Sequence, residues 1–360
     1  MTGRRKRILV DARKARDFGI GTYIRGLLGG LARLQVFDLR ALVLPGEEGL
    51  LATGVTATTC AARHYSLDEL VAVRRAISAV APDLFHAPHY VVPFFPPRAT
   101  VVTIHDLMHL NRSEHAAPAK RAYARWMIGR ALRLSARVIA VSDATKKEIL
   151  AFGPEWGGKV VVIPNGIRED FFEGGEEKGS YLLFLGNDKP HKNLDGLLSA
   201  WPRVRAAHPA LSLVLAGVAP GRVHAEGVRV LGFVPDAEVP GLVAGARALV
   251  LPSFAEGFGL PVIEAQAAGT PVACSDIPAL REAAGDAAVF FDPHDISSIA
   301  DALNMLLGDE EKRRFLRNGG RERAAQFTWA RVAERTAEIY DGVLYPFKEN
   351  PSSEKPERLS

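Results

Sequence analysis

The stretch LPSFAEGFGLPVIEAQAAGTP, Leu251–Pro271, predicts a buried strand, a glycine-rich turn and the start of a helix. The residues up to Leu251 form a short apolar run, as expected of a buried strand. Leu260–Ala268 has helical character, with Pro261 in the first turn, where a missing N–H costs nothing. A strand, a glycine loop and a helix N-terminus in this order aim free backbone N–H groups at an anion, usually a phosphate.

Two glutamates, Glu256 and Glu264, lie eight residues apart across this turn. Glu256 is expected on the loop and Glu264 in the first turn of the helix. A carboxylate beside a phosphate loop would repel the phosphate, so we expect both to meet hydroxyl groups of a sugar or ribose. Gly257 and Gly259 are expected to let the main chain approach that ligand. The alternative is a plain helix start with acids that the helix dipole favours.

The segment resembles the E-x7-E signature of the retaining glycosyltransferases of the large nucleotide-sugar family four, which have the GT-B fold. Other parts of the family pattern follow in the expected order, and the resemblance covers about Arg7 to Leu344. They are Phe18–Tyr23 (FGIGTY), Thr103–Asp106 (TIHD), Val141–Lys147 (VSDATKK), Ile163–Ile167 (IPNGI) and Phe184–Leu194 (FLGNDKPHKNL). The resemblance implies an α/β fold: two Rossmann-like domains, their parallel sheets facing a central cleft, and a C-terminal helix that crosses back.

Alternating apolar runs and helical patterns in both halves of the chain agree with two parallel α/β domains. The expected strands of the first half are Arg7–Asp11, Leu39–Leu44, Leu84–His86, Thr100–Ile104, Val138–Val141 and Val160–Ile163. Those of the second are Tyr181–Leu185, Ser212–Ala216, Arg229–Leu231, Ala248–Leu251, Pro271–Cys274 and Ala288–Phe291. Leu194–Ala207, Ile296–Leu307 and Thr328–Leu344 are expected helices.

The predicted boundaries follow from these patterns and from the resemblance. They are an acceptor-binding domain at 1–168, a polar linker at 169–179, a nucleotide-sugar-binding domain at 180–327, the crossing helix at 328–345 and a disordered tail at 346–360. Because ligand loops of such sheets lie at the carboxyl ends of the strands, motifs that follow strands are expected to line the cleft. His105, Asn187 and Glu256 all follow predicted strands.

The composition is that of an ordinary globular protein, with 48% hydrophobic and 24% charged residues among 360. No apolar run reaches the roughly 18 residues that span a bilayer, and the basic start lacks a signal-peptide core. Cys60 and Cys274 lie far apart in the sequence, which favours reduced thiols. The sequence therefore predicts a cytoplasmic protein, peripheral at the inner face of the membrane if it binds one.

Charge is distributed unevenly along the chain. Residues 1–170 carry 25 Lys and Arg against 15 Asp and Glu, a balance of +10, and residues 171–360 carry 20 against 26, a balance of −6. A basic half indicates an anionic partner. The chain shows no nucleic-acid-binding motif, so nucleic acid is not expected. Arg112–Arg137, basic and interleaved with Tyr123, Trp126, Met127 and Ile128, suits a helix on an anionic membrane surface or, alternatively, a surface helix with a core face.

His105, which ends a predicted strand, is a candidate catalytic residue. Its ring nitrogens can hydrogen-bond sugar hydroxyls or the leaving phosphate, and Asp106 is expected to fix its tautomer. In the resembled family the matching histidine lies against the donor sugar. His109 invites a metal interpretation, but no third ligand accompanies it and the chain has no Asp-x-Asp, so no metal and no cofactor are expected.

Lys192 is the expected cation for the donor diphosphate, because an ammonium at a helix start stabilises charge on a departing oxygen. The chain departs from the resembled family at Asn187, where an arginine is usual after the strand-end glycine. Lys189 or His191 is then left to supply the second positive group. A solvated basic turn is the structural alternative.

The resemblance implies further donor contacts in both domains. They are Gly19 and Gly21 after the first strand, Phe233 over the base, and Phe258, Gly259, Leu260 and Glu264 around the second-domain loop. Gly19 and Gly21 lack the third dinucleotide glycine, because Ile24 stands there, which disfavours nicotinamide. Asn165 and Gly166 are expected to be structural, in a tight turn with positive φ. Ser142 is expected to cap a helix.

The predicted function is that of a retaining, metal-independent glycosyltransferase. It would move a hexosyl unit, with mannosyl preferred, from a nucleotide-diphosphate sugar to a glycan or lipid-linked acceptor in cell-envelope polysaccharide synthesis. Glu256, Lys192 and His105 would be the catalytic residues. Two alternatives stay open: another GT-B enzyme, such as a sugar-nucleotide epimerase, and a non-catalytic partner subunit of the same fold.

Overall fold

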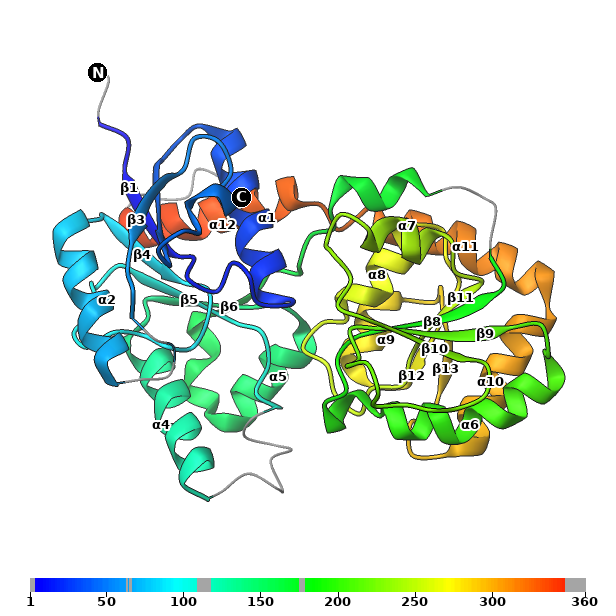
Figure 1. Ribbon diagram of the computed structural model, residues 1–360. Coiled ribbons are helices and arrows are strands. Elements are labelled where there is room, and N and C mark those ends of the chain that lie inside the picture. Colours follow the sequence, from blue (N-terminus) through cyan, green and yellow to red (C-terminus); the bar gives the residue numbers. More distant parts are fainter. Residues whose placement is uncertain (1–3, 63, 65–66, 109–117, 175–178, 347–360) are drawn as a thin grey trace, which may run out of the picture.

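Two parallel sheets, one in each half of the chain, organise the computed structural model (Figure 1). The structure describes residues 4–62, 64, 67–108, 118–174 and 179–346. Within them the first sheet has seven strands in the order β3-β2-β1-β4-β5-β6-β7, and the second has six in the order β10-β9-β8-β11-β12-β13. Neighbouring strands of both sheets pair in parallel, for example β1 with β4 and β8 with β11. The expected pair of Rossmann-like domains is confirmed.

The first domain alternates strands with helices. Its strands are β1 (Arg7–Asp11), β2 (Asp38–Val43), β3 (Thr56–Thr59), β4 (Leu84–Ala87), β5 (Thr100–Ile104), β6 (Arg137–Ala140) and β7 (Val160–Val162). Its helices are α1 (Ile20–Leu34), α2 (Leu67–Val80), α4 (Pro118–Leu134) and α5 (Asp143–Phe152), with short 3₁₀ turns η1 (Glu48–Leu50) and η2 (Pro154–Lys159).

The second domain repeats the same rhythm. Its strands are β8 (Tyr181–Leu185), β9 (Ser212–Ala216), β10 (Val228–Gly232), β11 (Ala248–Leu251), β12 (Val272–Ser275) and β13 (Val289–Phe291). Its helices are α6 (Leu194–Ala207), α7 (Val239–Ala244), α8 (Leu260–Ala267), α9 (Pro278–Ala284), α10 (Ile296–Gly308) and α11 (Glu310–Ala324), with 3₁₀ turns η3 (Glu169–Glu173) and η4 (Pro190–Lys192).

All twelve expected strands are present, with ends that agree to within one residue. Strand β3, which the sequence pattern does not predict, pairs with β2 at the edge of the first sheet. Its sequence, TATT, has no apolar alternation, and its side chains are exposed or half-buried. An edge strand of this kind gains its backbone hydrogen bonds from β2 and needs little hydrophobic burial, so the hydropathy pattern carries no sign of it.

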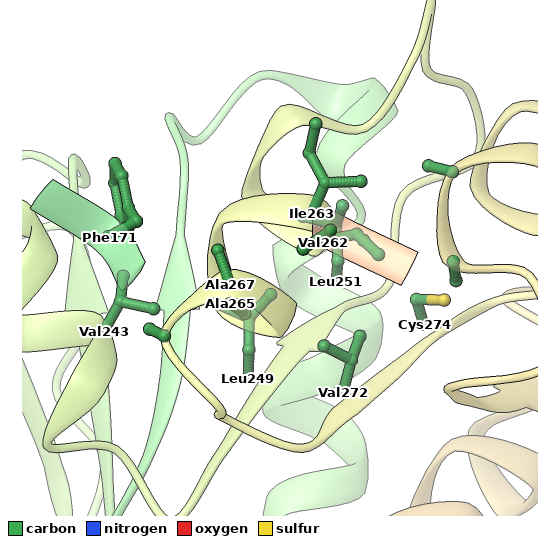
Figure 2. Packing of buried hydrophobic residues seen from close by; sticks show 14 of the residues in the cluster. Phe171, Val243, Leu249, Leu251, Val262, Ile263, Ala265, Ala267, Val272 and Cys274 are labelled. Atoms are coloured by element: carbon green, nitrogen blue, oxygen red, sulfur yellow. The ribbon is translucent and has the colours of Figure 1, made fainter. Parts of the chain in front are cut away.

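Both faces of the inner strands β4, β5, β11 and β12 are buried, which is why these strands are largely apolar rather than alternating. Figure 2 shows the core beneath α8, where Leu249, Leu251 and Val262 pack with Val272 and Cys274. On the other face of the second sheet α6 and α10 enclose a second cluster that includes the fully buried Trp201. Cys60 and Cys274 are both buried free thiols.

The segment that the sequence marks as a linker is partly packed. Glu169–Glu173 forms η3, and its Phe171 is buried in the core of the second domain beside Val243 (Figure 2). The backbone of Gly174 lies so close to Ala268 that a β-carbon would be 2.6 Å from its carbonyl oxygen. The described part of the linker therefore belongs to the second domain.

The expected crossing helix is α12 (Trp329–Leu344), capped by the Thr328 hydroxyl, which accepts a hydrogen bond from the Arg331 N–H. In Figure 1 it leaves the second domain and lies along α1 of the first. Gly30 of α1 permits this contact, because a β-carbon there would lie 2.6 Å from the carbonyl oxygen of Trp329. The predicted tail falls outside the described residues from 347 onward, as do His109, residues 112–117 of the basic segment and residues 175–178 of the linker.

Candidate active site

The strand order of each sheet reverses at one point, and candidate residues gather there. In the second sheet the reversal lies between β8 and β11. From β8 the chain continues to β9 and β10 on one side, and from β11 it continues to β12 and β13 on the other. The loop after β8 carries Lys192, and the loop after β11 carries Glu256. In the first sheet the reversal lies between β1 and β4. Open parallel sheets bind ligands at such points, so these loops form the candidate ligand site.

Lys192 and Glu256 form an ion pair at this point of the second domain. Nζ of Lys192 donates to Oε1 of Glu256 over 2.7 Å, and the two side chains are 14% and 9% exposed. The Ser253 hydroxyl donates to the same oxygen over 2.6 Å. The carboxylate is thus oriented by two donors, which fits a group that must point in one direction. The sequence pattern does not single out Ser253.

Glu264 was expected in the first turn of its helix. It is instead the fifth residue of α8. The helix begins at Leu260, one residue after the left-handed Gly259, so the first turn holds no acid and a dipole role is excluded. Burial raises the pKa of the Glu264 carboxyl to about 7, opposed by Arg168 and reinforced by Asp170 and Asp236. A carboxyl with this pKa exchanges its proton near neutral pH.

His105 follows β5 in the first domain and is held as a neutral imidazole. Its Nε2 lies 3.1 Å from the carbonyl oxygen of Pro88, which can only accept, so Nε2 carries the proton and Nδ1 is an acceptor. Burial lowers the pKa of His105 to about 4. The expectation that Asp106 fixes this tautomer is wrong, because the Pro88 carbonyl accepts the ring proton at Nε2. The Asp106 carboxylate instead accepts a hydrogen bond from the Met108 N–H over 3.0 Å.

The two domains touch directly beside these residues. Ser142 caps α5 as expected, accepting from the Thr145 N–H over 2.9 Å. Its hydroxyl also lies 2.5 Å from the carbonyl oxygen of Gly257, across the domain boundary. The carboxylate of Glu282, on α9, accepts from the N–H groups of Asp143 and Ala144 over 2.8 and 3.1 Å. Sequence patterns do not reveal these contacts, because they join segments more than 100 residues apart.

Packing accounts for the glycines at 257 and 259. A β-carbon at Gly257 would lie 1.9 Å from the carbonyl oxygen of His105, so the glycine lets the domains meet rather than only letting a ligand approach. At Gly259 φ is +102°, and a β-carbon would lie 2.6 Å from Leu280. These contacts explain why position 259 has no side chain. A contact between the Gly259 backbone and a donor stays a prediction.

The residues of the basic turn after β8 differ in burial. Asn187, where the resembled family has arginine, is half-buried, and its Oδ1 accepts from the Lys189 N–H over 3.3 Å. Lys189 is exposed, whereas His191 is half-buried and its carbonyl oxygen accepts from the Phe254 N–H over 2.8 Å. The His191 backbone therefore lies against the loop that carries Glu256. Which of Lys189 and His191 supplies the second positive group stays a prediction.

Phe233 extends from the second domain toward the first. It is 70% exposed, and its ring meets that of Phe18, also 70% exposed, edge-on with centroids 6.2 Å apart. Beside this pair Arg25 of α1 contacts Asp236 over 2.6 Å. Phe233 and the loop before α1 thus face each other across the domain boundary.

The other predicted donor contacts differ in what their side chains can do. Phe258 is buried and packs edge-on against Phe327, 5.6 Å between centroids, so only its backbone can face a donor. Leu260 is half-buried. Gly19 has φ +65° and open space beside it, whereas a β-carbon at Gly21 would lie 2.5 Å from the carbonyl oxygen of Ala15.

Gly166 is structural, but neither it nor Asn165 forms the expected turn with positive φ, and the role of Asn165 stays a prediction. Neither has a positive φ. A β-carbon at Gly166 would lie 2.6 Å from the Trp329 nitrogen, and the next residue, Ile167, bridges to Thr328. The glycine is therefore needed because the first domain's last segment packs against the start of the crossing helix.

The basic helix α4 is anchored in the core by Met127 and Ile128, both fully buried. Its exposed residues include Arg121, Arg125 and Trp126, the last 49% exposed. The Arg125 guanidinium lies over the Phe152 ring of α5, 4.8 Å from its centroid. Met127 and Ile128 thus pack in the core, in agreement with the alternative interpretation of a surface helix with one core face. Among the described helices none is long and apolar enough to cross a membrane. The described residues also hold no group of three His, Cys, Asp or Glu side chains arranged for a metal ion.

Comparison with solved structures defines the class. Sucrose-phosphate synthase from Thermosynechococcus elongatus superposes with a TM-score of 0.80 at 19% identity, covering 95% of this chain and all of that one. Anabaena Alr3699/HepE, solved in complex with UDP and glucose, gives a TM-score of 0.73 at 17% identity, covering 94% of this chain and all of that one. The chain has the GT-B fold of glycosyltransferases.

Sequence comparison defines the family. Residues 166–323 match Glycosyl transferases group 1, and residues 19–171 match Glycosyltransferase Family 4. The O-antigen chain mannosyltransferase B of Escherichia coli is 30% identical over 284 residues, which cover 71% of this chain and 74% of that protein. This chain therefore belongs to the group 1 glycosyltransferases.

Proposed function

We propose that this glycosyltransferase transfers a hexosyl unit, with retention of the anomeric configuration and without a metal, from a nucleotide-diphosphate sugar. The observation that carries the proposal is the oriented Lys192–Glu256 pair at the reversal point of the second sheet. Gly257, the residue after Glu256, touches the backbone of His105 in the first domain. Cation, carboxylate and neutral imidazole thus come from three loops that meet at the domain boundary.

Each of these groups has a role that its chemistry supports. Lys192 would exchange its partner for the donor diphosphate and stabilise the charge that grows on the departing oxygen. Glu256 would lie near the sugar, where positive charge grows at the anomeric carbon. His105, an acceptor at Nδ1, would take a hydrogen bond from a sugar hydroxyl. The departing diphosphate would act as base for the acceptor hydroxyl on the same face of the sugar.

The donor would lie mainly on the second domain. Glu264 would accept hydrogen bonds from ribose hydroxyls, and Phe233 would cover the base. Support for a nucleotide diphosphate comes from the UDP in the structure of Anabaena HepE, a structural neighbour. Support for mannose comes from the name of the E. coli relative. Both belong to those proteins and reach this chain only as proposals.

The acceptor would lie on the first domain and would be a glycan or a lipid-linked glycan of the cell envelope. The exposed Arg121 and Arg125 on α4 would hold that domain against an anionic membrane surface. Trp126, half-exposed beside them, would sit at the interface.

Donor hydrolysis and thermal shift test the proposal together. A nucleoside diphosphate that binds only the folded protein raises its melting temperature. The diphosphate that gives the largest shift identifies the base, and its sugar conjugates are then tested for slow release of diphosphate. An interconverted sugar that stays on its nucleotide would indicate an epimerase. Binding without any turnover, with or without glycan acceptors, would indicate a partner subunit.

A further inference from the structure

A chain of buried hydrogen bonds crosses the core of the first domain. The Tyr340 hydroxyl on α12 lies 2.6 Å from Nδ1 of His86 on β4. Nε2 of His86 lies 2.8 Å from Oγ1 of Thr103 on β5, and that oxygen lies 2.9 Å from the Tyr23 hydroxyl on α1. All four side chains are fully buried. The chain of bonds thus joins α1 and the neighbouring strands β4 and β5 to α12, whose Tyr340 lies 254 residues from His86 in the sequence.

All members of this chain are uncharged. Burial lowers the pKa of His86 to about 3, so its imidazole is neutral at physiological pH. Burial also raises the pKa of both tyrosines, Tyr23 and Tyr340, above the usual value. A neutral imidazole offers one donor and one acceptor, which the two hydroxyl neighbours match. Because an unpaired polar group is costly in a core, losing one member strains the positions of the others.

The chain ends against the candidate catalytic histidine. The Tyr23 ring meets the His105 ring edge-to-face, with centroids 4.9 Å apart and an interplanar angle of 83°. On its other side the Tyr23 ring neighbours Trp329, the first residue of α12, at 6.1 Å. His105 is therefore held twice, through Nε2 by the Pro88 carbonyl and through its ring by Tyr23.

We propose that Tyr23 is a positioning residue for His105, and that the chain from Tyr340 through His86 and Thr103 keeps Tyr23 in place. The proposal rests on the proposed function, because it requires His105 to meet the donor sugar. It gives the crossing helix a part in catalysis: α12 supplies both the Tyr340 hydroxyl at one end of the chain and Trp329 beside Tyr23.

A double-mutant cycle on the full chain tests the proposal. Tyr23→Leu removes the ring contact, and we expect kcat for donor turnover to fall on the order of 10- to 100-fold with donor KM nearly unchanged, because small misplacements of catalytic groups cost this much. Tyr23→Phe, which keeps the ring, should restore most of the loss. In a His105→Ala background Tyr23→Leu should cause no further loss, because residues that act as a unit are not additive.

Tyr340→Phe tests the far end of the chain without touching His105. We expect a fall in kcat of about threefold that also vanishes in the His105→Ala background. Tyr181→Phe is the matched control, since it removes a tyrosine hydroxyl that donates to the Leu242 carbonyl over 2.6 Å in the second domain. That variant should keep its kcat.

The possible failures are distinct. If His105→Ala keeps a normal kcat, the role of His105 in the proposed function is wrong. If His105→Ala lowers kcat but the Tyr23 effects add to it in full, the positioning proposal is overturned while the proposed function stands. Nitrogen NMR of ¹⁵N-histidine-labelled protein gives a readout without turnover. The Pro88 carbonyl should keep the His105 ring protonated at Nε2 in all variants. The His105 ring-nitrogen signals should shift in Tyr340→Phe and Tyr23→Leu, because the ring contact with Tyr23 is altered or lost. An unchanged His105 signal in both folded variants would also overturn the positioning role.

Discussion

Gly257 of the second domain and His105 of the first are in backbone contact, so close that a β-carbon on Gly257 would lie 1.9 Å from the His105 carbonyl oxygen. This contact joins the loop that carries Glu256 to the strand end that carries His105. The Ser142 and Thr145 hydroxyls, both within 3.2 Å of the Gly257 carbonyl oxygen, close the same junction. The relative position of Glu256 and His105 thus depends on the absence of a side chain at Gly257.

Gly257→Ala should disturb this junction. The methyl group would overlap a backbone atom, which cannot move aside as a flexible side chain does, so we expect the domains to separate locally and kcat to fall by about 10-fold or more. The matched control is Gly241→Ala in helix α7, where a β-carbon would meet nothing within 4 Å. Steady-state kinetics of both variants decide. A Gly257→Ala enzyme with the kinetics of Gly241→Ala would show that the junction has no part in turnover.

Glu256→Gln should act mainly on kcat. The change keeps the side-chain shape but removes the charge that would face the developing positive charge of the sugar. We expect kcat to fall on the order of 10²–10³, the range for single electrostatic groups in active sites. The measurement is steady-state kinetics with the true donor. A near-normal kcat would mean that the loop is only a structural turn and that the site assignment is wrong.

Glu264→Gln should act mainly on donor KM, because ribose contacts are made equally in the ground and transition states. Ribose hydroxyls donate to the carboxylate form, so donor KM of the native enzyme should rise as pH falls below about 7, the pKa that burial gives this carboxyl. Glu264→Gln should lose that dependence. A native KM that is flat between pH 5 and pH 8 would contradict the assignment.

The same carboxyl has an effect on stability. Since its pKa in the folded protein, about 7, lies above the ordinary 4.5, the folded state holds the proton more tightly. Its stabilising contribution is complete below pH 4.5 and is lost as pH rises through 7. Denaturant unfolding of Glu264→Gln at several pH values should show this loss removed, and provides a check that does not depend on turnover.

Activity should not require a divalent metal. Lys192 and the helix N-termini near it would supply the positive charge at the diphosphate that a metal supplies in other enzymes. We expect full donor turnover in EDTA. Activity that EDTA abolishes and manganese restores would refute this prediction and would assign the diphosphate charge to an ion.

The first domain should bind vesicles rich in anionic lipid, and salt should weaken the binding because exposed charges are screened. Arg121→Glu with Arg125→Glu, both exposed on α4, should reduce co-sedimentation. Arg203→Glu, on an exposed face of the second domain, is the control. If native protein sediments equally with anionic and neutral vesicles, α4 is only a core helix with a solvated face.

Local sequence patterns were enough to predict every strand except the edge strand β3, together with the candidate residues that follow the strands. Thr100–Ile104 and Tyr181–Leu185 are apolar because both faces of their sheets are buried, and such runs are visible without neighbours. The glycine loop before Leu260 likewise follows from φ preferences and from the helix start. These are properties of a few consecutive residues, and the sequence carries them directly.

The tertiary structure alone decided which residues meet. Glu282 reaches α5, Tyr340 reaches His86, and Gly257 meets His105 across more than 100 residues of chain, and no local pattern specifies such a pairing. It also corrected local inferences: Gly166 is needed for the contact with Trp329 and not for a turn. The physical reason is that the burial of a residue, its pKa and its close contacts depend on what packs against it. Those neighbours are defined only when segments far apart in the sequence pack together.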